Sequence, residues 1–334
     1  MLAFISSLLL VLPLVGGGNR HATVKVYRQA DTLTQAPEVK PLLSWKRIQL
    51  PNTFTDADAL SVLFPGEIQL LYSYDTILRS YWRCPKCDTI RLPGTFDDEF
   101  EYFIDSNTKD TRILGTLYFQ DSLRYKQLYI ITCTNDDEGD VSGIITGRFN
   151  CGIISLAHFL ADSGGYSLQA YRPYWQCLGL FGAPSPPKLL EVGPNQFAMR
   201  FTNTMQGGGG PVFGDFIITE PYQHSFRTIL DRTFEELWNT QGCDFHSTLE
   251  PNKAELHEGH YDLQLTTAGE FTLIEELSDH DLAILPAKLV AFSKKHEGAR
   301  FIWKRSYRFQ NNMYQQIKET IKMSPIISSS GVGK

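Results

Sequence analysis

Hydrophobic and polar positions along the chain mostly follow the period of two that is typical of β-strands. In the clearest case, residues 300–309, aromatic side chains occupy one face and basic side chains the other, and Arg305 is the single exception. The aromatic positions are Phe301, Trp303, Tyr307 and Phe309, and the basic positions are Arg300, Lys304 and Arg308. Runs rich in β-branched and aromatic residues predict further strands at 45–50, 67–74, 99–104, 128–134, 196–203 and 261–267.

Turn residues between these runs indicate that neighbouring strands form hairpins. The polar cluster 135–140 separates two Ile-rich runs, and Asn311-Asn312 separates Phe309 from Tyr314. The expected fold class is therefore mainly β, with antiparallel, hairpin-rich sheets in two β-sandwich or barrel-like domains.

Propeller-like repeats are the alternative fold. Similar short words recur at Arg148-Phe149-Asn150, Arg200-Phe201 and Arg308-Phe309, at intervals close to one and two blade lengths.

One or two short helices are expected. Residues 226–238 carry apolar side chains at helical spacing, with Ser225 placed to cap the start and Gly242 to end the segment. Residues 55–64 predict a shorter helix with Thr55 as N-cap and Pro65 after its end. The segment 285–295 fits either a helix or a strand.

Changes in composition suggest a division into domains. Residues 1–18 are predicted to be a signal peptide, because an uncharged apolar run too short for a membrane span leads into three glycines. An N-terminal β-rich domain over 19–182, a Pro-rich linker at 183–187 and a C-terminal β-rich domain with one helix over 188–323 follow. Residues 324–334 are expected to be a disordered tail.

The net charge and the apolar leader limit which partners and which cellular compartment are expected. The formal charge of −6 gives no general attraction for nucleic acid, so no nucleic-acid partner is expected. The apolar leader predicts export to a periplasmic, cell-surface or extracellular location, without a transmembrane helix in the mature chain.

Export permits disulfides, and six cysteines allow fifteen pairings that the sequence does not distinguish. Cys84 and Cys87 are read as disulfide-forming rather than as a redox pair.

The spacing of cysteine and histidine in the C-terminal half suggests a zinc site. Cys243 and His246 form one close pair, and His257 and His260 form a second. Two such pairs suit a tetrahedral ion if the chain between them folds back. A closed shell of four ligands makes the zinc structural. If Cys243 forms a disulfide instead, the three histidines leave a position for water and suggest a metal-dependent hydrolase. Exposed loop residues are the plainer alternative.

Two other groups of side chains suggest binding. Tyr171, Tyr174 and Trp175 surround Arg172, and their flat faces suit stacking on sugar rings or on side chains of a partner; packing in the core is the alternative. The basic positions of 300–309, with Lys294 and Lys295, suit an acidic partner or equally a solvated strand face.

No complete catalytic constellation is evident in the sequence. The leading hypothesis is therefore an exported, non-catalytic binding or envelope-associated protein, whose partner is an envelope glycan or another exported protein. The metal-dependent hydrolase is the alternative.

Overall fold

The computed structural model describes the chain from residue 48 to residue 326 with internal gaps. The described ranges are 48–64, 66–73, 76–83, 90–93, 101–104, 109–121, 123–136, 151–179, 184–206, 212–240, 243–272 and 285–326. These residues belong to one compact unit, Pro41–Lys334. The predicted signal peptide and the Cys84–Cys87 pair lie outside the described residues.

The described chain is mainly antiparallel β with two short helices, which confirms the predicted fold class. The N-terminal elements are β1 (Gln49–Leu50), α1 (Asp56–Leu63), β2 (Glu67–Ser73), β3 (Thr76–Arg83), β4 (Ile90–Pro93), β5 (Glu101–Ile104), β6 (Lys109–Gln120), β7 (Lys126–Asp136), β8 (Gly152–Asp162) and β9 (Gly165–Leu178). The C-terminal elements are β10 (Lys188–Gly193), β11 (Gln196–Gln206), β12 (Val212–Tyr222), β13 (Ser225–Thr240), β14 (Cys243–His257), β15 (His260–Phe271), α3 (Ala287–His296), β16 (Ala299–Gln310) and β17 (Met313–Pro325).

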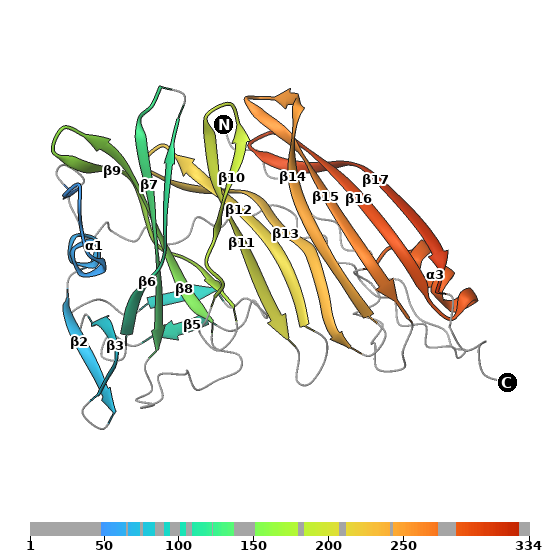
Figure 1. Ribbon diagram of the computed structural model, residues 1–334, viewed down its shortest axis with the longest axis horizontal. Helices are drawn as coiled ribbons and strands as arrows, with labels where there is room; N and C mark the ends of the chain where they lie inside the picture. Colours follow the sequence, from blue (N-terminus) through green and yellow to red (C-terminus); the bar gives the residue numbers. More distant parts are fainter. Residues whose placement is uncertain are drawn as a thin grey trace, which may run out of the picture. The chain divides into compact units, whose positions relative to one another are not determined.

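Two large sheets contain nearly all of these strands (Figure 1). The first has seven strands in the order β1-β9-β8-β7-β6-β3-β2, and the second has eight strands, β10 to β17, in chain order. A separate pair is formed by β4 and β5. The eight-stranded sheet is an uninterrupted meander rather than a set of four-stranded blades, so the propeller-like alternative is not what these strands form.

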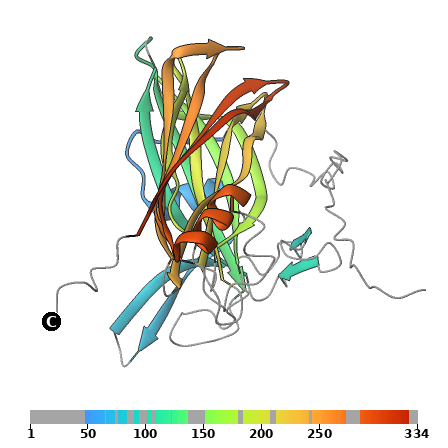
Figure 2. The same ribbon diagram turned by 90° about the vertical axis from the view of Figure 1, so that its right-hand side faces the viewer.

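The eight-stranded sheet curls on itself. Strand β10 contacts β14 and β15, although three strands lie between β10 and β14 in the sheet order. The curl brings Glu191 of β10 into an ion pair with Lys253 of β14. Figure 2 shows α3 within this curl at one end of the strands, where Leu285 and Leu289 pack against Phe245, Phe271 and Phe301.

The two large sheets share a core, and β7 shows how. Leu128 and Ile130 point toward α1 and pack with Leu60 and Leu63. The alternate residues Tyr129, Ile131 and Cys133 point the other way and pack with Met199, Phe201 and Ile217 of the second sheet. Both faces of β7 are therefore buried, which explains its nearly unbroken apolar sequence.

The prediction of a helix at residues 226–238 is wrong, because this segment belongs to strand β13. Its pairing with β12 contains three register shifts, between Gly214 and Asp215 and on both sides of Ile218. Each bulge adds a residue to one strand and changes the spacing of inward-facing positions. Ile229 and Leu230 are consequently both buried although they are adjacent, which imitates the apolar spacing of a helix.

The structure contains helices at the other two segments considered from the sequence. The helix predicted over 55–64 is confirmed as α1, and Thr55 forms a capping box with Asp58. The ambiguous segment 285–295 contains most of α3.

Strand β16 confirms the alternation predicted for residues 300–309. Phe301, Trp303, Tyr307 and Phe309 are buried. The exception, Arg305, is also buried: its guanidinium lies 3.7 Å from the centre of the Trp303 ring, and Nη2 donates to Thr267 Oγ1 at 3.1 Å. Asn311 and Asn312 have φ values of 55° and 67°, as the tight turn of the predicted hairpin requires.

A disulfide joins Cys151, beside the start of β8, to Cys177 near the end of β9, with 5.4 Å between the Cα atoms. Cys133 is buried, and burial raises the pKa of its thiol to about 11. The predicted linker lies between β9 and β10, where the chain passes from the first large sheet to the second. β17 extends to Pro325, two residues into the predicted tail, and residues 327–334 are outside the described part.

Candidate functional site

The structure does not bring Cys243, His246, His257 and His260 together. His246 lies opposite Ala268 near one end of the β14–β15 hairpin, whereas His257 lies opposite His260 at the other end. At about 3.3 Å per strand residue, the two pairs are roughly 30 Å apart. The predicted four-ligand zinc site is therefore not formed, because the chain between the pairs runs straight along a strand instead of folding back.

The aromatic residues singled out for stacking on a ligand are mostly in the core. Tyr171 is buried, and its hydroxyl donates to the Leu63 carbonyl at 3.2 Å. Trp175 is buried against Phe201. Tyr174 is half-buried beside Phe64, and Arg172 donates to the Phe226 carbonyl at 2.9 Å. These contacts match the core alternative, with β9 holding the junction of the two sheets.

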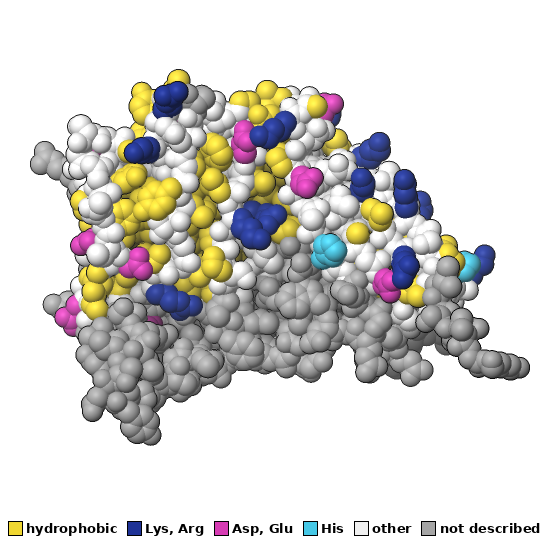
Figure 3. Space-filling model, viewed as in Figure 1, with side chains coloured by type: hydrophobic (Ala, Val, Ile, Leu, Met, Phe, Trp, Pro, Cys, Tyr) yellow, Lys and Arg dark blue, Asp and Glu magenta, His cyan; other side chains and the backbone are white. Residues whose placement is uncertain are grey.

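The basic face of β16 is partly neutralised by neighbouring carboxylates. Arg300 donates to Glu270 at 2.6 Å, and Arg308 donates to Asp262 at 3.0 Å. Lys304 is exposed. Figure 3 shows Lys and Arg side chains spread among other polar groups over the region of β14 to β17, while hydrophobic side chains gather over the first sheet. This arrangement matches a solvated strand face.

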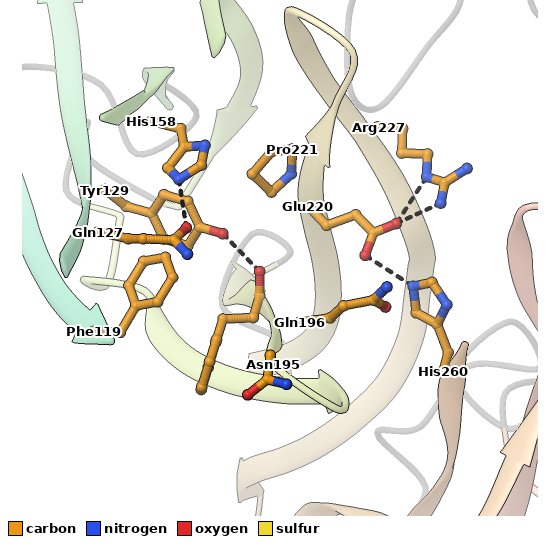
Figure 4. Close-up of a pocket in the computed structure, with 11 residues that line it drawn as sticks. Phe119, Gln127, Tyr129, His158, Asn195, Gln196, Glu220, Pro221, Arg227 and His260 are labelled. Carbon is orange, nitrogen blue, oxygen red and sulfur yellow. Dashed lines mark hydrogen bonds and ion pairs between the residues drawn. The ribbon is translucent and has the colours of Figure 1, made fainter. Parts of the chain in front are cut away.

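A pocket of about 250 Å³ opens where the hairpin ends of the two sheets meet (Figure 4). Residues from both sheets line it: Phe119, Gln127, Tyr129, His158, Asn195, Gln196, Phe197, Glu220, Pro221, Arg227 and His260. The first sheet contributes β6, β7 and β8, and the second contributes the β10–β11 turn and strands β11, β12, β13 and β15.

Glu220 is the centre of the pocket's polar wall. Arg227 lies opposite it in the β12–β13 hairpin and donates from Nε and Nη2 to Oε1 at 2.8 and 2.6 Å. His260 Nε2 lies 2.9 Å from Oε2, and the imidazole stacks on Phe309 with 3.7 Å between ring centres. Arg227 Nη1 also donates to Asn312 at 2.6 Å. Glu220 thus joins the β12–β13 and β14–β15 hairpins, and Arg227 extends the network to the β16–β17 turn.

Aromatic rings form the opposite wall. Phe119 lies against Tyr129 and Phe197, with ring centres 4.6 and 5.0 Å away. Tyr129 donates from its hydroxyl to the Phe197 carbonyl at 2.6 Å, and burial together with the Glu220 carboxylate raises its pKa. His158 Nε2 lies 2.8 Å from Gln127 Oε1, and burial lowers the pKa of His158 to about 4. His158 is therefore neutral at physiological pH.

The two walls together favour recognition of a small molecule. Glu220 is already matched by Arg227 and His260, so the polar wall does not demand a strongly charged ligand. No Ser, Thr, Cys or Lys occurs among the described lining residues, and the carboxylate in the lining, Glu220, is held by Arg227 and His260. What it offers is an apolar surface beside fixed hydrogen-bonding groups, which is the general pattern of a ligand site.

Sequence reasoning missed most of this pocket. Its residues are separated by up to 141 positions along the chain, from Phe119 to His260, and none forms a motif. His260 was singled out for the spacing that suggested zinc, but its partner in the structure is Glu220. The available signal was local: Glu220 and Arg227 flank the turn residues of a hairpin at positions where opposite charges can pair across strands.

A histidine with two carboxylates lies near the pocket at the end of the β14–β15 hairpin. Glu255, His257 and Asp262 present ligand atoms that all lie within 4.8 Å of one another. Of the four residues predicted to bind metal, His257 is the member that belongs to this group.

Comparison with known protein families, with curated proteins and with solved structures found no match to this chain. Among the described residues, no helix has the length and apolar character needed to cross a bilayer. The described residues form a mainly β chain with a small pocket of mixed polar and aromatic lining.

Proposed function

We propose that this chain is an exported, non-catalytic binding protein whose pocket between the two sheets holds a small polar ligand with one flat apolar face, such as a single sugar unit of a glycan. The observation that carries the proposal is the pairing of the Phe119, Tyr129 and Phe197 wall with the Glu220, Arg227 and His260 wall. Aromatic faces pack against the apolar face of a sugar, while amide and charged groups hydrogen-bond to its hydroxyls.

The size of the pocket limits the ligand. Its 250 Å³ is below the roughly 300–1,000 Å³ typical of sites for drug-sized molecules. One sugar ring or a molecule of similar size fits this volume, whereas a longer glycan would have to extend out of the opening. Gln196, an exposed residue of the lining, is placed to contact such an extension.

Export is the second part of the proposal. The apolar first fifteen residues motivate it, and the Cys151–Cys177 disulfide supports it, because disulfides persist mainly in oxidising compartments. Expression of the full chain in a secreting host, followed by N-terminal sequencing of the released protein, tests this part. Cleavage near residue 18 supports export, and an intact leader on protein retained in the cytosol contradicts it.

The hydrolase alternative loses its main support. It required a metal ion shared by three or four of Cys243, His246, His257 and His260, and the two pairs lie at opposite ends of the β14–β15 hairpin.

A ligand screen with a blocked pocket tests the binding function. Saturation-transfer NMR with a panel of monosaccharides is expected to give signals with the wild type that weaken in Gln196→Trp, because the indole fills the pocket opening. Gln315→Trp is the matched control, since Gln315 is an exposed strand residue on β17 that is not part of the pocket lining. Equal signals from all three proteins, or none from the wild type, would contradict the proposed site, and turnover of a sugar would contradict the absence of catalysis.

A further inference from the structure

The β14–β15 hairpin also brings together one histidine and two carboxylates, none of which lines the pocket proposed above. Pairing between these strands is regular up to Asn252 opposite Asp262 and then shifts, so that the next pair is Leu256 with Tyr261. Three residues of β14 are therefore accommodated between two consecutive positions of β15. This irregularity brings Glu255 and His257 to the side chain of Asp262.

The two distances from His257 Nε2 to the carboxylates are too long for hydrogen bonds and close to the spacing of two ligands on one ion. His257 Nε2 lies 3.7 Å from Glu255 Oε2 and 3.7 Å from Asp262 Oδ1. Two ligand atoms that each bind one tetrahedral zinc at about 2.0–2.1 Å lie roughly 3.4 Å apart. The two distances from His257 Nε2 exceed this separation by a few tenths of an ångström, and all three ligand atoms lie within 4.8 Å of one another, so modest side-chain movement would bring them to one ion.

His257 itself indicates that a partner belongs at this point. Its Nε2 atom is buried, and no hydrogen-bond acceptor or donor for it is found among the described residues. A buried imidazole nitrogen that makes no hydrogen bond carries a free-energy cost. A metal ion bound to its lone pair would remove that cost.

The charges and hydrogen bonds around Glu255, His257 and Asp262 also favour binding of a cation. Asp262 is almost fully buried, and Arg308 holds its carboxylate: Nη2 donates to Oδ2 at 3.0 Å, and Nε donates to Oδ2 at 3.3 Å and to Oδ1 at 3.4 Å. The same Oδ1 lies 3.7 Å from His257 Nε2. Such outer contacts orient ligands in many metal sites. Two carboxylates against one arginine leave a net negative charge, so a divalent cation is attracted.

We infer that Glu255, His257 and Asp262 form a binding site for a divalent transition-metal ion of the zinc class. One imidazole nitrogen with two carboxylate oxygens suits zinc and its neighbours, whereas calcium and magnesium prefer six or more oxygen ligands. The site differs from the one expected from sequence, since His260 is engaged with Glu220 and His246 lies at the far end of β14.

Isothermal titration of the full-length protein with zinc chloride tests the inference. The wild type is expected to bind one ion that His257→Ala and Glu255→Gln weaken by about 10-fold or more. Glu255 is about half exposed, so its replacement is not expected to disturb folding. His246→Ala is the matched control, because it removes an exposed histidine from the same strand without touching the group.

Each outcome of the titration either supports or overturns the proposed metal site. Loss of affinity in both group variants with unchanged binding by His246→Ala supports the site. Absence of zinc binding by the wild type overturns it, and so does equal binding by His257→Ala and Glu255→Gln. A wild type that prefers calcium over zinc overturns the assignment to a transition metal. None of these results depends on whether the neighbouring pocket binds a sugar.

Discussion

The burial of His158 makes the stability of the folded protein sensitive to acid. The folded protein holds its pKa at about 4, below the ordinary value of 6.5, so in acid the unfolded chain takes up this proton before the folded protein does. The stability due to neutral His158 is complete above pH 6.5 and is lost as the pH falls toward 4. At pH 4.5 we expect a loss of about 2 kcal/mol from this residue.

Urea unfolding of the wild type and of His158→Gln at pH 7 and pH 4.5 measures the effect. Glutamine retains a hydrogen bond to Gln127 but does not titrate in this range, so the wild type is expected to lose more stability in acid than the variant. A stability difference between the two proteins that does not change with pH would contradict the prediction.

Glu220 and Glu191 both form ion pairs, but Glu220 is the more buried of the two. We therefore expect its replacement to cost more in the free energy of unfolding. Glu220 is 8% exposed and holds Arg227 and His260, so Glu220→Ala leaves a partly buried guanidinium unpaired. We expect a loss of about 3 kcal/mol in the free energy of unfolding.

Glu191→Ala is the comparison for this prediction. Glu191 pairs with Lys253, whose side chain is 58% exposed, and a solvent-exposed pair contributes less than about 1 kcal/mol. Chemical denaturation of the two variants is the measurement, and equal losses would show that the Glu220 network does not hold the hairpin ends together.

At the level of elements, the curl of the eight-stranded sheet depends on a close approach of two turns. A Cβ atom at Gly193, at the end of β10, would overlap the carbonyl oxygen of Gly259 in the β14–β15 turn. We expect Gly193→Ala to push these turns apart and to destabilise the protein by about 1–3 kcal/mol, because backbone has to move.

Gly115→Ala is the control for the turn contact. A Cβ there would lie 3.7 Å from Pro187 Cδ, which is ordinary van der Waals contact. Thermal unfolding of both variants, with ligand and zinc binding as further readouts, checks the prediction. Similar melting temperatures for the two would mean that the approach of β10 to β14 and β15 is not tightly constrained.

At the level of the whole molecule, the Cys151–Cys177 disulfide constrains the first sheet next to its junction with the second. The two cysteines are separated by 26 positions, and closing a loop of this size stabilises a fold by about 3 kcal/mol in the chain-entropy description. We expect the double variant Cys151→Ser, Cys177→Ser to lose roughly this amount in urea unfolding.

Mass spectrometry of unreduced peptides is the accompanying measurement for the disulfide. Linked peptides that contain Cys151 and Cys177 are expected from protein prepared under oxidising conditions. Alkylation of both thiols in the native protein would contradict the pairing.

The sequence predicted those features of the fold that are set by local chemistry. Period-two alternation identified β16, because one face of that strand is buried and the other is solvated. Thr55 marked the start of α1, because a capping side chain acts on the backbone three residues away. The same local reasoning failed at β13, where bulges imposed by pairing with β12 changed the spacing of buried residues.

What the sequence determined by itself was the mainly β class and the hairpin connections, since side-chain alternation and turn residues act over a few positions. Only the tertiary structure decided which side chains meet. The curl of β10 to β17 and its junction with β7 and β8 bring Glu220, His260 and Tyr129 to one pocket, and a shift in strand pairing brings His257 to Asp262 instead of Cys243. Such contacts depend on register and sheet curvature, which are properties of many strands together and leave no motif in any one of them.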